Sequence, residues 1–174
     1  MTTMRSRAAL LAVAFGALAC DAGLAPQPTC PPGFVGICGT VTFRGALPDS
    51  TDVVYVVAYT TFPTTQNDLF NFKPLPPPTL RLDSTARAAP QAYTLALPAG
   101  TYQWVLAAWK KQGALSPQNA DSLLREAGFY RDPADTSKAG TIVVSGAVTG
   151  ADFIVDFTNM HPVSFYFPAI RSTR

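Results

Sequence analysis

Two strands joined by a tight turn are predicted by the residues Tyr93-Thr-Leu-Ala-Leu-Pro-Ala-Gly-Thr-Tyr-Gln-Trp-Val-Leu-Ala-Ala-Trp-Lys110. Tyr93, Leu95 and Leu97 recur at every second position, which is the period of a strand with one buried face. The central Pro-Ala-Gly predicts the turn. In the second strand we expect one alternate set to face the core, namely Tyr102, Trp104, Leu106 and Ala108, and the other set to face outward, namely Gln103, Val105, Ala107 and Trp109.

The same period recurs on both sides of this pair. Alternating or β-rich segments lie at 40–44, 52–61, 141–144, 151–157 and 163–167, separated by turns rich in glycine and proline. Strands that follow one another without intervening helices favour an all-β, antiparallel β-sandwich. We expect a common core made of Phe43, Tyr55, Leu95, Trp104 and Phe153.

Two segments interrupt this order of strands. Residues 62–90 form a long proline-rich insertion that contains Pro74 and Pro76-Pro77-Pro78. Residues 116–128 predict one short helix, because Ser116 suits an N-cap, Pro117 suits the first turn and Gly128 suits the exit.

The first 20 residues are typical of an export signal. Arg5 and Arg7 precede an apolar run, Ala8–Ala19, that is too short for a membrane span of about 20 residues. The run ends at Cys20, as in the signal of a bacterial lipoprotein, where the cysteine carries the lipid. The small residues Ala17 and Ala19 also suit the ordinary secretory peptidase, so lipidation of Cys20 and simple secretion are both open.

The cysteines favour lipidation. The chain has three cysteines, and an exported protein seldom keeps an odd free thiol. If Cys20 carries lipid, Cys30 and Cys38 remain as a pair for a disulfide. The division predicted is a cleaved signal peptide at 1–19, a lipid-anchored proline-rich linker at 20–38, a β-sandwich domain at 39–168 and a tail at 169–174.

Charge excludes one class of partner. The 13 basic residues exceed the 11 acidic ones by two, and Arg5 and Arg7 of the leader account for that excess. A balanced chain has no electrostatic attraction to nucleic acid, so we expect no nucleic-acid partner.

The order of segments resembles the transthyretin-like, carboxypeptidase-regulatory-like β-sandwich superfamily. The residues that carry the resemblance are Gly39-Thr-Val-Thr-Phe-Arg-Gly45, Pro48 and the strand Val53–Ala58, then Tyr93–Tyr102, Thr141–Gly146 and Asp152–Phe157. It implies a seven-stranded sandwich that acts as a structural, ligand-presenting or carbohydrate-associated module. Such domains usually have no catalytic activity of their own. The insertion at 62–90 and the excursion at 116–135 depart from the pattern.

The candidate ligand-binding residues are aromatic. Trp109, expected on the outer face, is a candidate to join Phe70, Phe72 and Tyr130 in a platform that stacks on sugar rings. The apolar residues of this face, Val54, Val56, Val105 and Ala107, favour the alternative, in which the two excursions fold over it and bury Trp109.

The sequence offers no group of residues suited to catalysis or to metal binding. His161 is the only histidine and favours a surface or capping role, and Asp132 and Asp135 favour a capped turn over a calcium site. We therefore predict no catalytic residue, no metal and no cofactor.

The function predicted is that of an exported, lipid-anchored, non-catalytic protein with a structural or interaction role at the bacterial cell envelope. Its partners are then the membrane, through the anchor, and either a polysaccharide or another envelope protein. One alternative is a carbohydrate-binding module, and a further one is an envelope hydrolase.

Overall fold

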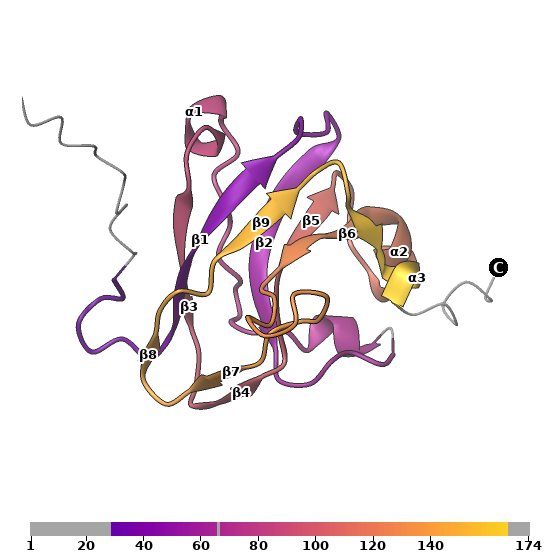
Figure 1. Ribbon diagram of the computed structural model, residues 1–174. Coiled ribbons are helices and arrows are strands. Elements are labelled where there is room, and N and C mark those ends of the chain that lie inside the picture. The colour runs from indigo at the N-terminus through magenta and orange to yellow at the C-terminus, as the bar shows by residue number, and fades with distance from the viewer. Residues whose placement is uncertain (1–28, 66, 167–174) are drawn as a thin grey trace, which may run out of the picture.

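The structure, a computed structural model, describes residues 29–65 and 67–166, and strands dominate it (Figure 1). Within these residues ten strands form three sheets, and every helix is a single turn. The protein is therefore all-β, as the alternating segments predicted, with more strands than the seven that the resemblance implied. The strands are β1 (Gly36–Arg44), β2 (Thr51–Tyr59), β3 (Gln91–Ala96), β4 (Gly100–Tyr102), β5 (Trp104–Lys111), β6 (Leu124–Phe129), β7 (Ile142–Val144), β8 (Ala147–Val148), β9 (Phe153–Asp156) and β10 (His161–Pro162).

The first sheet is built around β1. Strand β3 pairs with one edge of β1 in antiparallel orientation, whereas β8 and β9 pair with it in parallel orientation. The prediction of a purely antiparallel arrangement was therefore wrong for this sheet. The parallel pairs arise because the chain returns to β1 from the short β4–β7 sheet, which lies beyond the start of β1.

The break between β8 and β9 has a local cause. A Cβ atom on Gly39 would lie 2.3 Å from the carbonyl oxygen of Ala151, so the backbone of β1 and the segment before β9 are in contact at this point. There Asp152 Oδ1 accepts hydrogen bonds from the backbone N–H of Thr40 at 2.6 Å and from its hydroxyl at 2.8 Å. A side chain thus replaces one step of the ladder and divides the strand in two.

The second sheet has the order β10-β6-β5-β2 and is antiparallel throughout. Its inner face shares one core cluster with β1, β3 and β9 of the first sheet. The β2 and β5 side chains in that cluster are Val54, Val56, Ala58, Val105, Ala107 and Trp109.

The assignment of faces in β2 and β5 was wrong. Tyr55 and Trp104 were expected in the core with Leu95 and Phe153, but they lie on the outer face, in a second apolar cluster. Both faces of these strands are apolar, so alternation shows that two faces exist without showing which is inner. Phe72 and Tyr166 cover the outer face.

The helix predicted over residues 116–128 forms only in its first half. The 3-10 turn η2 (Pro117–Asn119) and the helix α2 (Ala120–Leu123) have the predicted capping by Ser116, and β6 follows directly. Residues Leu124–Phe129 pair with β5 instead, and the ladder supplied by β5 outweighs the local helical spacing.

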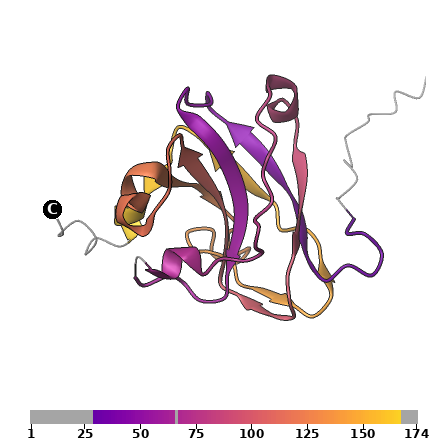
Figure 2. The same cartoon turned by 180° about the vertical axis from the view of Figure 1, so that it is seen from behind.

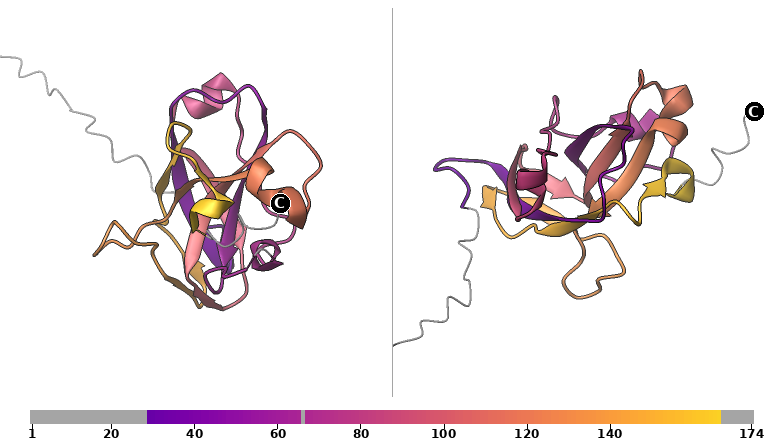
Figure 3. Two further views of the ribbon diagram at one scale, coloured as in Figure 1. Left: turned by 90° about the vertical axis from the view of Figure 1, so that its right-hand side faces the viewer. Right: turned by 90° about the horizontal axis from the view of Figure 1, so that it is seen from above.

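The last strand predicted, at 163–167, is also wrong where the structure describes it. Val163–Tyr166 is the helical turn α3, which follows the two-residue strand β10. The backbone N–H of Ser164 donates to Asp121 Oδ1 at 2.7 Å, so α3 lies beside α2 at one end of the molecule (Figure 3).

The proline-rich insertion runs along the free edge of β2 (Figure 2). Ala58 and Lys73 exchange two backbone hydrogen bonds of 2.8 Å, Val56 N–H donates to the Pro78 carbonyl at 3.0 Å, and Leu80 N–H donates to Val54 at 2.9 Å. The insertion also contains η1 (Asn67–Phe70) and α1 (Ser84–Arg87), the latter capped by Asp83. It therefore completes the edge of the second sheet without forming a regular strand.

A disulfide ties the start of the described chain to the first sheet. Cys30 and Cys38 are bonded, with their Cα atoms 5.6 Å apart, and Cys38 lies within β1. The pairing predicted for these two cysteines is confirmed. The signal peptide, Cys20 and the tail at 169–174 lie outside the described residues. No helix in the described ranges has both the length and the apolar character needed to cross a membrane.

Candidate functional site

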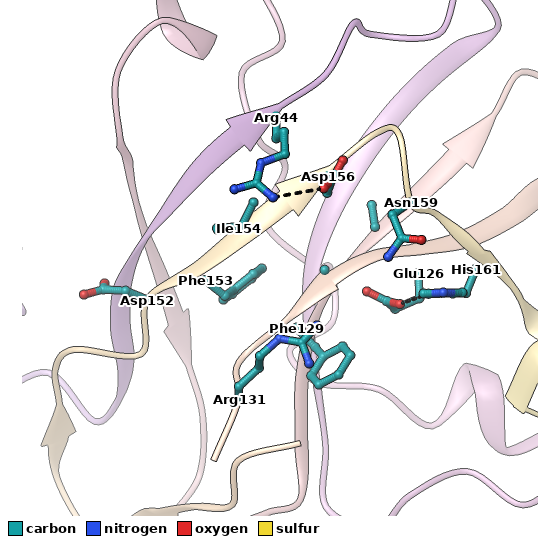
Figure 4. A pocket seen from close by; sticks show the side chains of 12 residues that line it. Arg44, Glu126, Phe129, Arg131, Asp152, Phe153, Ile154, Asp156, Asn159 and His161 are labelled. Carbon is teal, nitrogen blue, oxygen red and sulfur yellow. Dashed lines mark hydrogen bonds and ion pairs between the residues drawn. The ribbon is translucent and has the colours of Figure 1, made fainter. Parts of the chain in front are cut away.

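A polar cleft of about 440 Å³ lies where the two larger sheets meet (Figure 4). We call it the seam cleft. Its floor is formed by β6 and β9, one strand from each sheet. The side chains around it include Arg44, Glu126, Arg131, Asp152, Ile154, Asp156, Asn159 and His161.

Gly128 brings the two sheets together under the seam cleft. A Cβ atom at this position would lie 1.8 Å from the carbonyl oxygen of Ile154, closer than any two such atoms can approach. The φ angle of Gly128 is +150°, a backbone conformation that favours glycine. Only a glycine therefore lets β6 lie directly against β9.

A β-bulge next to Gly128 sets the position of Glu126. Ala107 pairs with Gly128 and Ala108 pairs with Glu126, so Ala127 is the extra residue on β6. Bulges re-aim neighbouring side chains and are common beside functional sites. Here Ala127 is buried in the core, and Glu126 is directed to the wall of the seam cleft.

Glu126 is a buried carboxylate with two hydrogen-bond donors on one oxygen. His161 Nδ1 lies 2.9 Å from Glu126 Oε2, and the Tyr166 hydroxyl donates to the same oxygen at 2.7 Å. Only 6% of the Glu126 side chain is exposed. The other oxygen, Oε1, has no hydrogen-bond partner within residues 29–65 and 67–166. Burial and the adjacent Glu126 carboxylate raise the pKa of Tyr166.

The two arginines come from different parts of the chain. Arg44, at the end of β1, lies 3.6 Å from Asp156 Oδ2. Arg131, just after β6, stacks on the Phe129 ring at 4.4 Å and donates from Nη1 to the Thr136 carbonyl at 2.8 Å. These contacts leave most of the N–H donors of both guanidinium groups without a protein partner in the described structure.

The aspartates are held by neighbouring backbone. Asp156 Oδ1 accepts from the N–H and the hydroxyl of Thr158, and these hydrogen bonds, with the Arg44 charge, lower the pKa of Asp156. Asp152 is fixed by Thr40 as described above. In both residues the oxygen that accepts these hydrogen bonds is Oδ1, and Asp156 Oδ2 faces Arg44.

The four aromatic residues that were candidates for a platform do not come together. Trp109 is 5% exposed in the core between the sheets, and its Nε1 donates to the Thr51 hydroxyl at 2.8 Å. Phe70, Phe72 and Tyr130 pack against three different apolar clusters. Burial of Trp109 was the outcome that the sequence favoured, and the core cluster that contains Trp109 includes Leu80 of the insertion together with residues of both larger sheets.

The remaining candidates are placed as follows. Asp132 and Asp135 accept hydrogen bonds from Ala134 and Ser137 two residues ahead, which confirms the capped turn. His161 lines the seam cleft. No group of three or more His, Cys, Asp or Glu side chains in the described ranges is arranged to hold a metal ion.

The seam cleft was not predicted from the sequence. Glu126 was assigned to a helix, and the close contact of Gly128 with Ile154 joins residues far apart in the chain. One signal was available, because Glu126 is the only glutamate and His161 the only histidine in the chain. Single residues of two reactive types often have a specific partner, and here they are partners of each other.

Fold and site define an all-β protein with a polar cleft at the junction of its two larger sheets. Comparisons of the chain with protein-family models, with curated proteins and with solved structures found no match.

Proposed function

We propose that this is an exported, lipid-anchored and non-catalytic β-sandwich protein of the transthyretin-like, carboxypeptidase-regulatory-like kind, with an interaction role at the bacterial cell envelope. One observation supports the lipid anchor. The disulfide uses Cys30 and Cys38, so Cys20 is the one cysteine of the three that remains, and it stands at the end of the apolar leader. A structural disulfide also fits an oxidising compartment outside the cytoplasm.

The architecture supports the sandwich class. Two four-stranded sheets share one core cluster, and the strand–turn–strand unit at 93–102 forms β3 and β4. The insertion, which departs from the family pattern, adds to an edge of the second sheet and contributes Leu80 to the shared core cluster.

The use of the titratable groups supports an interaction role over catalysis. Glu126 Oε2 holds His161 and Tyr166 in place, and the ring of His161 stacks on Phe165 at 4.3 Å. Within the described residues, His161 contacts Glu126, Phe165 and Tyr166, and none of these is a serine, threonine or cysteine nucleophile.

Lipid labelling in the native host tests the anchor. Cells that express the full-length protein are fed a clickable fatty acid, and the purified protein is assayed for label and for membrane association. We expect wild type to be labelled and membrane-bound. Cys20→Ser should lose both properties.

The double variant Cys30→Ser, Cys38→Ser is the matched control, because it removes two sulfurs but leaves Cys20. It should keep the label. Label that persists in Cys20→Ser, or a wild-type protein recovered without lipid in the soluble fraction, would contradict the proposal.

A carbohydrate-binding role is the second candidate. It does not rest on the aromatic residues that the sequence suggested, since Trp109 is buried. It is favoured instead by the mixed donors and acceptors of the seam cleft.

A further inference from the structure

We propose that the seam cleft is a binding site for a neutral, polyhydroxylated ligand, a saccharide. The inference deepens the interaction role proposed above, but it is independent of the lipid anchor. It rests on the charge of the lining, on one buried carboxylate and on the shape of the floor.

The lining carries charges of both signs, which disfavours a charged ligand. Arg44 and Arg131 face three carboxylates, those of Glu126, Asp152 and Asp156. An anionic ligand would meet the carboxylates, and a cationic ligand would meet the guanidinium groups. A hydroxyl group both donates and accepts, so a ring of hydroxyls can satisfy both kinds of group without carrying charge.

Glu126 supplies a fixed acceptor. Its side chain is almost wholly buried, its Oε2 is held by two donors, and its Oε1 has no partner in the described chain. Figure 4 shows the carboxylate directed toward the cleft, with His161 behind it. No buried side-chain oxygen of the described residues lacks a hydrogen-bond partner, so Oε1 is open to solvent, and a ligand hydroxyl can donate to it there.

Donors lie on the other sides of the cleft. The guanidinium groups of Arg44 and Arg131 come from above and below in Figure 4, and the Asn159 amide lies near Glu126. Asn159 adds a side chain that both donates and accepts. Acceptors and donors therefore surround one space, as a ligand with several hydroxyls requires.

The floor is apolar and exposed. Ile154 on β9 is 43% exposed and lines the cleft, and Figure 4 shows it below Arg44. The C–H face of a sugar ring can lie on such a side chain while its hydroxyls reach the rim. The cleft volume of about 440 Å³ is within the range of roughly 300–1,000 Å³ for small-molecule sites.

Binding of the full-length protein to neutral and acidic oligosaccharides tests the proposal. The protein, in detergent, is screened on an array that carries both classes, and each hit is titrated by calorimetry. We expect binding to neutral glycans. Ile154→Trp fills the floor and should weaken that binding by at least about tenfold.

Val143→Trp is the matched control, because Val143 is a strand residue, 64% exposed, outside the cleft lining. It should bind like wild type. Glu126→Gln gives a second variant that keeps the size of the side chain while replacing one acceptor oxygen with a donor, and it should also weaken binding.

Three outcomes would overturn the proposal. They are binding to acidic glycans alone, no glycan binding at all, and neutral-glycan binding that Ile154→Trp leaves unchanged. None of them bears on the lipid label, so failure of this site is distinguishable from failure of the anchor.

Discussion

Glu126 and His161 meet only because β6 and β10 are adjacent strands of one sheet. The register pairs these two residues directly, so their side chains lie on the same face. Tyr166, on the turn that follows, reaches the same carboxylate oxygen. The three side chains hold the last described turn against the second sheet and fix one wall of the seam cleft.

Gly128 is the residue on which the closure of the seam depends. In Gly128→Ala the new Cβ would collide with the Ile154 carbonyl oxygen. The backbone fixes the positions of both atoms, so a side-chain rotation cannot relieve the collision. We expect the variant to lose at least about 2 kcal/mol of unfolding free energy. Chemical denaturation of the full-length protein measures the loss.

Gly100→Ala is the control for this prediction. Gly100 has a φ of +158°, close to that of Gly128, but a Cβ atom there would meet nothing within 4 Å. The loss of unfolding free energy in Gly100→Ala should be limited to the backbone cost of about 1 kcal/mol. Equal losses in the two variants would show that the contact between the strands does not matter.

At the scale of elements, β2 would be an open sheet edge without the proline-rich insertion. Exposed edges pair with other chains and promote aggregation, and proteins often cover them. Backbone groups of Lys73, Pro78 and Leu80 bond to the even-numbered residues of β2. The odd-numbered residues bond toward β5, as alternation in an antiparallel pair requires.

This arrangement predicts a pattern of amide hydrogen exchange. Replacing residues 74–79 with a short Gly-Ser linker removes the Val56–Pro78 hydrogen bond and loosens the segment that reaches Ala58. The amides of Val56 and Ala58 should then exchange faster. The amide of Val57, on the β5 side, should stay protected, and NMR-detected exchange resolves the three positions.

Faster exchange at Val57 as well would mean that the insertion stabilises the whole strand pair. Unchanged exchange at Val56 and Ala58 would contradict the role of edge cover.

At the scale of the whole molecule, buried tyrosines make the fold sensitive to alkali. Burial raises the pKa of Tyr59 and of Tyr93 far above the ordinary value of about 10. The Tyr59 hydroxyl donates to the Leu69 carbonyl, and that of Tyr93 donates to the Ala151 carbonyl. The Tyr59 bond ties β2 to the insertion, the Tyr93 bond joins residues 58 positions apart, and both require the protonated phenol.

The sign of the effect follows from proton binding. Above about pH 10 the unfolded chain loses these two protons while the folded chain keeps them, so stability is full below pH 10 and falls as pH rises. Each of the two tyrosines should cost about 1 kcal/mol of unfolding free energy between pH 10 and 11. Urea titrations at pH 8, 10 and 11 measure the slope.

Tyr93→Phe lowers stability at pH 8 through the lost hydrogen bond but removes one titrating group. Its stability should therefore fall less steeply above pH 10 than that of wild type. Parallel slopes would show that Tyr93 does not keep its proton in the fold.

Part of this architecture could be predicted from the sequence, and part could not. Period-two alternation located β1, β2, β3, β5 and β9, because the pleat sends successive side chains to opposite faces wherever a strand forms. It failed for β6, whose apolar residues also suit a helix, because the choice depended on the free edge of β5.

The sequence by itself determined the all-β class, the Cys30–Cys38 pair and the tight turn before β4, since each follows from local chemistry. The tertiary structure alone decided which face of β2 and β5 is inner, where Trp109 lies, and that a cleft exists at the β6–β9 seam. The physical reason is that these features depend on which distant strands lie next to one another. Local alternation gives the same pattern for either face and contains no information on that pairing.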